Sequence, residues 1–199
     1  MRTLLLDIGG VFYLGRPDES FWARWAAEAQ MAPDALRAQF WHGPDIEATN
    51  VGAIEAAEYH RRAGARMGLS PDLVRAMTEE AFLSDPNHAF ADFVRGLRAD
   101  GLAVSALTNS WSSEAQLKAR PLLAGLFDQV ISSRDVGLTK PDPAIFHLTL
   151  DQLALPAGEV LFVDDTPGHV EAARSLGIGG LRFEATDQAC ADIRRWMSA

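Results

Sequence analysis

Short apolar runs that alternate with helix-like stretches limit the fold of this chain more than any other feature of its sequence. Five runs bounded by turn residues have the character of buried strands: residues 4–6, 102–107, 130–131, 160–163 and 181–183. Three stretches between them carry apolar residues at helical spacing: residues 88–101, 143–153 and 167–176. This alternation predicts an α/β fold, a Rossmann-like doubly wound parallel sheet with helices on both faces.

One long connection, after the first strand, interrupts the alternation. It has no convincing strand, and four stretches in it have helical character: residues 18–31, 33–41, 52–65 and 71–82. We therefore expect a helical cap domain over residues 14–85, inserted into a core domain made of residues 1–13 and 86–199. The candidate hinges are residues 14–17 and 83–86, which contain Gly, Ser and Pro.

Composition excludes several classes of protein. The chain has 199 residues, of which 27 are acidic and 18 basic, so its formal net charge is −9 and no basic cluster is available for a nucleic-acid partner. Charged residues or prolines break every apolar run before it reaches the ~20 residues of a membrane span. With a single cysteine, Cys190, and no secretory signal, we expect a soluble, cytoplasmic protein without a membrane partner. Whether it is a monomer or a homodimer stays open.

Polar side chains follow four of the predicted strands. Because ligands gather at the carboxyl ends of parallel strands, these side chains should meet in one crevice. They are Asp7, Thr108, Asn109, Lys140, Asp164 and Asp165. Asn109 also fits a helix cap in the turn after its strand.

This set of residues suits phosphoryl transfer. An attacking carboxylate such as Asp7 repels a phosphoryl group unless the charge is neutralised. Mg²⁺ held by carboxylates and the ammonium group of Lys140 would neutralise it, and Thr108 would hold phosphate oxygens. Gly9 and Gly10 let the backbone turn sharply beside the ligand.

Four segments in this order, LLLDIGGVF, ALTNS, TKPDP and LFVDDTPGHVEAARSLGI, resemble the four motifs of the haloacid dehalogenase superfamily. The helical insertion is similar to the small cap of that superfamily, and the resemblance spans nearly the whole chain. It implies a hydrolase with a Mg²⁺ cofactor and a small phosphorylated metabolite as substrate.

The resemblance also implies a role for each matching residue. Asp7 would be the nucleophile that forms an aspartyl-phosphate, and Lys140 would stabilise charge. Thr108 would bind the phosphate, with Gly10 and Asn109 as further substrate-binding residues. The metal ligands would be Asp7, the Gly9 carbonyl, Asp164 and Asp165, and which of the last two binds directly stays open.

Gly9 departs from the common pattern of the superfamily, in which a second Asp at this position serves as general acid and base. Such assistance is typically worth 10²–10⁴-fold in rate, about 3–5 kcal/mol. A subgroup of sugar-phosphate phosphatases that this chain resembles also has Gly here, so the departure does not imply inactivity. A milder departure is His169, where many relatives have Asn; it could contact the cap or help proton transfer.

Trp41 is the candidate substrate-binding residue of the cap. The aromatic residues around it are first of all candidates for the cap core. Trp41 lies in a less regular segment, residues 40–45, which could present aromatic and polar groups to a substrate such as a sugar.

Three functions follow from these observations. The first is a Mg²⁺-dependent phosphatase that acts through Asp7. The second is a 2-haloacid dehalogenase, which needs no metal and is disfavoured by the pair Asp164 and Asp165. The third is a catalytically degenerate protein that binds a phosphorylated ligand or a partner, because Gly9 replaces the general acid.

Overall fold

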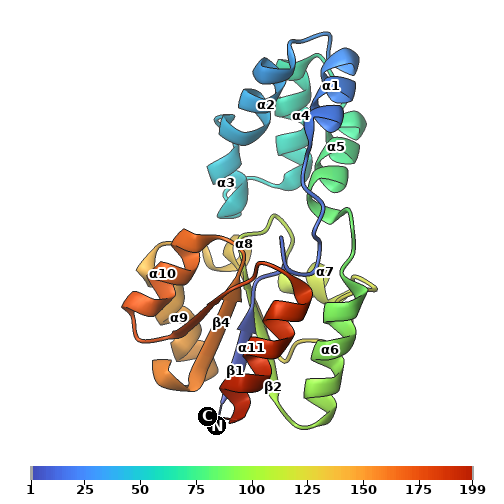
Figure 1. Ribbon diagram of the computed structural model, residues 1–199. Helices are drawn as coiled ribbons and strands as arrows, with labels where there is room; N and C mark the ends of the chain where they lie inside the picture. Colours follow the sequence, from blue (N-terminus) through green and yellow to red (C-terminus); the bar gives the residue numbers. More distant parts are fainter. Residues whose placement is uncertain (1, 199) are drawn as a thin grey trace.

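The computed structural model describes residues 2–198 and confirms the predicted parallel α/β fold. Its five strands form one parallel sheet in the order β3-β2-β1-β4-β5 (Figure 1). The strands are β1 (Thr3–Leu6), β2 (Ala103–Thr108), β3 (Val130–Ser132), β4 (Val160–Asp164) and β5 (Gly179–Arg182). From β1 the chain order runs outward in both directions, so the carboxyl ends of β1, β2 and β4 lie side by side at the switch point of the sheet.

Helices cover both faces of the sheet. Leu4 and Leu6 of β1 are buried with α6 (His88–Ala99), α7 (Glu114–Lys118) and α11 (Thr186–Ser198). Leu5 points the other way and is buried with α9 (Pro143–Leu153) and α10 (Pro167–Ser175). The alternation of these leucines is the period of a strand that is buried on both sides. The short elements α8 (Ser133–Val136) and η1 (Ala157–Glu159) lie in the connections before α9 and β4.

The fifth strand is the one whose position the sequence predicted least well. It runs over Gly179–Arg182, whereas the apolar pattern placed it at residues 181–183. Two glycines begin the strand and give no apolar signal. A Cβ on Gly180 would lie 2.7 Å from the Arg174 side chain of α10, so the close contact between helix and strand favours a residue without a side chain there.

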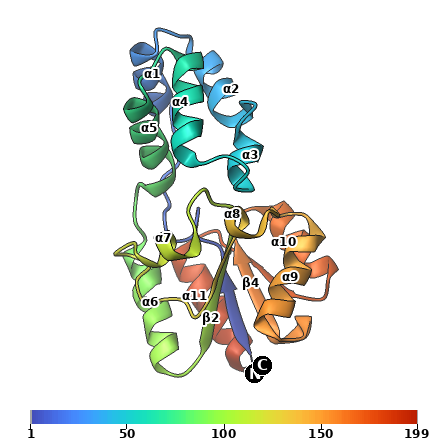
Figure 2. The ribbon, with the colours of Figure 1, turned by 180° about the vertical axis from the view of Figure 1, so that it is seen from behind.

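A separate group of helices stands above the sheet (Figures 1 and 2). These helices are α1 (Glu19–Glu28), α2 (Pro33–His42), α3 (Ile46–Asn50), α4 (Ala56–Met67) and α5 (Pro71–Leu83). They share a hydrophobic cluster of their own, in which Trp22, Trp25, Phe40, Tyr59 and Met77 are buried. For this reason we keep residues 14–85 as the proposed cap domain.

The prediction of one helix over residues 52–65 of the cap was wrong at its start. The chain forms the short α3 first, and α4 begins only at Ala56. Gly52 separates the two helices with φ +71°, a left-handed conformation that ends a helix. A Cβ there would meet the backbone carbonyl of Arg134 in the core, so this turn is also a point of contact between cap and core.

Two antiparallel linkers connect the cap to the core (Figure 2). The Leu14 N–H donates to the Asp85 carbonyl at 2.9 Å, and the Gly15 N–H donates to the Ser84 carbonyl at 3.1 Å. A Cβ on Gly15 would overlap the Ser84 hydroxyl, so glycine permits the close pairing. Over residues 2–198, no helix combines the length and apolar character needed to cross a membrane.

Candidate active site

Three strand ends bring together side chains that were predicted for catalysis, phosphate binding and metal binding. Asp7 follows β1, Thr108 is the last residue of β2 and Asp164 is the last residue of β4. All three side chains are buried. Lys140 reaches the same point from the loop before α9, and its ammonium Nζ lies 2.9 Å from Asp7 Oδ1 and 2.6 Å from Asp164 Oδ2.

Asn109 holds the backbone of Lys140 in place. Its side-chain oxygen accepts from the Lys140 N–H at 2.8 Å, and its amide nitrogen donates to the Lys140 carbonyl at 2.9 Å. Lys140 Nζ donates in addition to the Leu107 carbonyl at 2.9 Å. Asn109 therefore positions Lys140, and it also lines the cavity between cap and core, so its predicted role in substrate binding stays a prediction.

Burial and the ion pairs set the charges of this cluster. Burial raises the pKa of Asp7 to about 6, and the attraction of Lys140 opposes this shift. Burial also works to raise the pKa of Asp164, but Lys140 and His169 outweigh it, so the pKa of Asp164 is lowered. Burial disfavours the charged form of Lys140, yet the two carboxylates dominate and raise its pKa. Lys140 and Asp164 are therefore the fixed ion pair of the site.

Asp7, Asp164 and His169 form the candidate metal centre. One potential ligand atom from each lies within 4.8 Å of the others. Two buried carboxylates face one ammonium group, and the negative charge left over fits a cation with hard oxygen ligands such as Mg²⁺. His169 Nδ1 lies 3.0 Å from Asp164 Oδ2, a contact with which an imidazole orients a carboxylate ligand.

Asp165 lies outside this cluster. Its carboxylate forms an ion pair with Arg16, which belongs to the first linker of the cap. It also lies over Gly10, where φ is +70° and a Cβ would collide with the Asp165 carboxylate. The glycine expected to bind substrate thus provides room for Asp165 beside the loop after β1.

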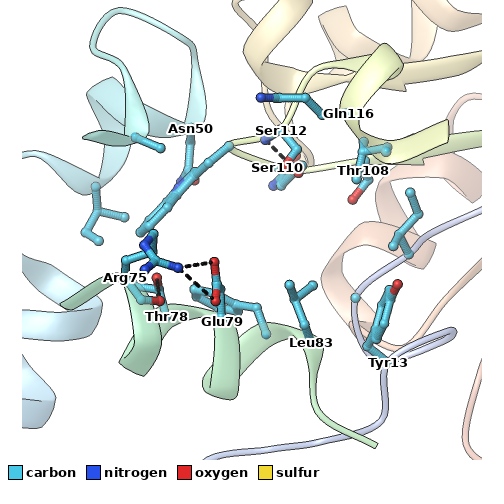
Figure 3. Close-up of a pocket in the computed structure, with 18 of the residues that line it drawn as sticks. Tyr13, Asn50, Arg75, Thr78, Glu79, Leu83, Thr108, Ser110, Ser112 and Gln116 are labelled. Atoms are coloured by element: carbon cyan, nitrogen blue, oxygen red, sulfur yellow. Dashed lines mark hydrogen bonds and ion pairs between the residues drawn. The ribbon is translucent and has the colours of Figure 1, made fainter. Parts of the chain in front are cut away.

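A cavity of about 560 Å³ lies between cap and core. Ile8, Gly9 and Thr108 line it on the core side, and the predicted Trp41 lines it on the cap side. Figure 3 shows Thr108 and Tyr13 of the core on one side of this cavity, with Asn50 and Arg75 of the cap on the other. Neither Asp165 nor Gly10 lines it.

Several side chains that surround this cavity were not predicted from the sequence. The most prominent are Tyr13, Phe82 and Trp111. Trp111 had a usable signal, because it follows Asn109 by two residues in the same strand-end loop. Phe82 and Tyr13 had none, since each lies beside a linker whose path depends on the pairing of two distant segments.

Direct hydrogen bonds hold the cap against the core. The Trp111 indole N–H donates to Asn50 Oδ1 at 2.7 Å, and the Ser133 hydroxyl donates to the Asn50 carbonyl at 2.6 Å. Arg134 forms an ion pair with Glu55 at 2.6 Å. The carboxyl end of α3 is therefore attached to α8 and to the loop after β2, which closes one side of the cavity.

Comparison with known proteins agrees with this architecture. The family model for haloacid dehalogenase-like hydrolases matches residues 1–177. The sesquiterpene phosphatase astK of Aspergillus oryzae is 27% identical over 200 residues, which cover 98% of this chain and 95% of the relative. The (S)-2-haloacid dehalogenase of Pseudomonas putida is 32% identical over 114 residues, 56% of this chain and 50% of the relative.

Other relatives are much longer than the region they share with this chain. The pig bifunctional epoxide hydrolase 2 is 36% identical over 106 residues, and the match spans 50% of this chain but only 19% of the relative. Among solved structures, a HAD-family enzyme of Bacteroides thetaiotaomicron in complex with magnesium and inorganic phosphate superposes with a TM-score of 0.73. It is 21% identical, and the match covers 92% of this chain and 93% of that one.

Proposed function

Because this chain belongs to the haloacid dehalogenase-like hydrolases, we propose that it is a Mg²⁺-dependent phosphatase acting on a small phosphorylated metabolite. The reaction passes through an aspartyl-phosphate on Asp7. The observation that carries this proposal is the buried cluster in which Lys140 lies between Asp7 and Asp164, beside the cavity at the strand ends. A phosphate oxygen next to Asp7 would meet a cation there rather than a second uncompensated anion.

The first step is attack by Asp7 on phosphorus. Asp7 Oδ1 accepts from the Ile8 N–H at 2.7 Å and lies 2.9 Å from Lys140 Nζ, which fixes the carboxylate. Within residues 2–198 its other oxygen has no hydrogen-bond partner, so Oδ2 is the atom that attacks. The Thr108 hydroxyl likewise has no partner in the described part of the chain and can donate to a phosphate oxygen.

Mg²⁺ fits the same cluster. We propose Asp7, the Gly9 carbonyl and Asp164 as its protein ligands, and when bound it would neutralise charge on the transferring phosphoryl group. His169 would orient Asp164 through their contact. Asp165 would not bind the metal directly as long as its ion pair with Arg16 is formed.

When its bond to phosphorus breaks, an alkoxide leaving group must take up a proton, which here comes from solvent water. Gly9 has no side chain to supply one, although a Cβ at this position would meet nothing within 4 Å. The missing assistance matters most for alkoxide leaving groups and least for acyl phosphates. Water then attacks the aspartyl-phosphate, which releases phosphate and restores Asp7.

Two relatives support phosphoryl transfer, one as a named phosphatase and one through its bound magnesium and phosphate. The similarity to sugar-phosphate phosphatases and the cytoplasmic location stay predictions, and the choice between monomer and homodimer stays open. The named dehalogenase keeps 2-haloacid dehalogenation as the second candidate. Halide release in the presence of a chelator, without phosphate release, would favour that candidate.

The test is phosphate release from a panel of phosphate esters and acetyl phosphate, with Mg²⁺ and with a chelator. We expect activity only with Mg²⁺ and a loss of more than about a thousandfold in Asp7→Asn, as for other catalytic nucleophiles. Asp151→Asn is the matched control, because this exposed aspartate of α9 lies outside the site. Equal activity of Asp7→Asn and the parent would contradict the proposal, and an inactive parent would favour a degenerate binding protein.

A further inference from the structure

We infer that the cavity between cap and core binds an apolar leaving group, so that the substrate is the phosphate monoester of a hydrophobic alcohol. This inference rests on the proposed phosphatase function, since it concerns what is bonded to the phosphate at the same site. It differs from the sugar phosphate that the sequence suggested.

The first observation is the row of aromatic side chains along the cavity. Trp41, Phe82 and Trp111 all line it. The ring centroids of Trp41 and Phe82 are 5.7 Å apart, and those of Phe82 and Trp111 are 5.8 Å apart. Ile46 and Leu83 extend the same apolar lining. A molecule in the cavity would therefore contact a continuous hydrophobic wall.

The second observation is that part of this wall is exposed. Trp41 is 40% exposed and Phe82 is 39% exposed, although most large apolar residues of the cap are buried. Exposed aromatic surface that gathers around a concave site marks a place where a ligand will cover it. The cap thus leaves two of its aromatic rings available where the cavity lies.

The third observation is that several polar atoms of the lining already have partners within the protein. Asn50 Oδ1 accepts from the Trp111 indole, and Gln116 Oε1 accepts from the Ser113 N–H at 2.8 Å. Arg75 and Glu79 pair with each other at 3.2 Å, as Figure 3 shows. Sugar hydroxyls that approach these atoms would have to compete with the bonds already made, and a hydroxyl buried without a partner is penalised.

The position of the cavity links this wall to the reaction. Ile8, Gly9 and Thr108 are among the residues of its core side, and Asp7 directly precedes Ile8, so the proposed phosphate site lies next to the cavity although Asp7 itself does not line it. A phosphate group at Asp7 would leave most of the 560 Å³ for the group attached to it. The aromatic wall therefore contacts the alcohol part of the ester.

The test compares two esters with similar leaving groups, cyclohexylmethyl phosphate and glucose 6-phosphate. Both place a six-membered ring on a primary carbon that bears the phosphate, so they differ mainly in the polarity of the ring. We expect kcat/KM to be at least about tenfold higher for cyclohexylmethyl phosphate, the size of discrimination typical of a hydrophobic pocket. Acetyl phosphate, which is too small to reach the wall, reports the core chemistry alone.

Two variants of α5 connect the preference to the wall. Phe82→Ala should lower the ratio of the two kcat/KM values about threefold to tenfold. Leu73→Ala is the matched control, because Leu73 is also 39% exposed on α5 but does not line the cavity. It should leave the ratio as in the parent.

The outcomes separate this inference from the proposed function. Hydrolysis of acetyl phosphate with no preference for cyclohexylmethyl phosphate, or a preference that Phe82→Ala leaves intact, overturns the inference and keeps the phosphatase. If no ester is hydrolysed, the affinities of Asp7→Asn for the two esters are compared instead, by titration followed through tryptophan fluorescence. Tighter binding of cyclohexylmethyl phosphate then upholds the apolar site without the phosphatase, and equal or weaker binding overturns it.

Discussion

The core and the cap contribute opposite kinds of side chain to the region where they meet. The core supplies charged groups that are almost fully buried, with the side chains of Lys140 and Asp164 both 0% exposed. The cap supplies aromatic rings that remain partly exposed, Trp41 and Phe82. Buried charges in fixed contact suit a reaction that is the same for every substrate, whereas open apolar rings suit selection among substrates. Substitutions in the core should therefore alter the hydrolysis of every substrate, whereas substitutions in the cap should alter the hydrolysis of some substrates only.

The largest effect is expected from Lys140→Met in the core. It removes the cation between two buried carboxylates, so we expect kcat to fall about 10²–10³-fold for every substrate. Without metal the stability should fall by about 3–5 kcal/mol, since buried charges lose their partner, and Mg²⁺ should restore part of it. Urea unfolding with and without Mg²⁺ measures this.

The other lysine of the chain, Lys118, provides the control. It forms an ion pair with Glu114 at 2.7 Å near the surface, and such a pair contributes about 0–1 kcal/mol. If Lys118→Met and Lys140→Met had similar effects, burial of the charge would not be the reason for the role of Lys140.

A smaller effect, on stability, should distinguish two neighbouring glycines in the loop after β1. Gly10→Ala must hold φ near +70° and push the Asp165 carboxylate aside, which we expect to cost about 1–3 kcal/mol. Gly9→Ala meets nothing within 4 Å and should be close to neutral. Thermal unfolding of both variants checks this order, and a reversed order would show that the loop takes a different path.

In the cap, we expect the substitution Asn50→Ala to change substrate binding and not the reaction itself. This variant leaves the Trp111 indole without its acceptor, a loss of about 1 kcal/mol that corresponds to roughly fivefold in binding. We expect KM to rise by about that factor for esters that fill the cavity, with no change for acetyl phosphate. A change in kcat for acetyl phosphate would remove the proposed division between core and cap.

The smallest expected effect is a pH dependence located in the cap. Burial lowers the pKa of His60, with a further contribution from Arg75. The folded protein then binds this proton less readily than the unfolded chain, so stability falls as the pH drops below the ordinary histidine value of about 6.5. His60→Gln should show a slightly smaller loss of stability between about pH 8 and pH 5. Chemical unfolding at both values measures it, and parallel curves for the two proteins would contradict it.

The sequence was most informative where local signals decide the structure. The apolar runs that became β1, β2 and β4 also fixed where Asp7, Thr108 and Asp164 would emerge, because the carboxyl ends of parallel strands meet. Lys140 was found from its place before a helix that begins with Pro143. These residues needed no knowledge of distant contacts.

The partners of some site residues depend on segments far apart in the sequence, and these were not predictable. Asp165 is not part of the metal cluster and instead forms an ion pair with Arg16 of the cap linker. The aromatic wall arises where α2, α5 and the loop after β2 meet, although Trp41 was recognised by itself. No local pattern reports the angle at which the cap stands over the sheet.

The most direct test of the account is to isolate the phosphorylated enzyme. The parent protein would be mixed with acetyl phosphate and Mg²⁺, quenched in acid within milliseconds to seconds, digested and analysed by mass spectrometry. The account predicts a phosphoryl group on Asp7 in the parent and none on the corresponding peptide of Asp7→Asn. Phosphoryl transfer to another residue, or rapid phosphate release by Asp7→Asn, would contradict it.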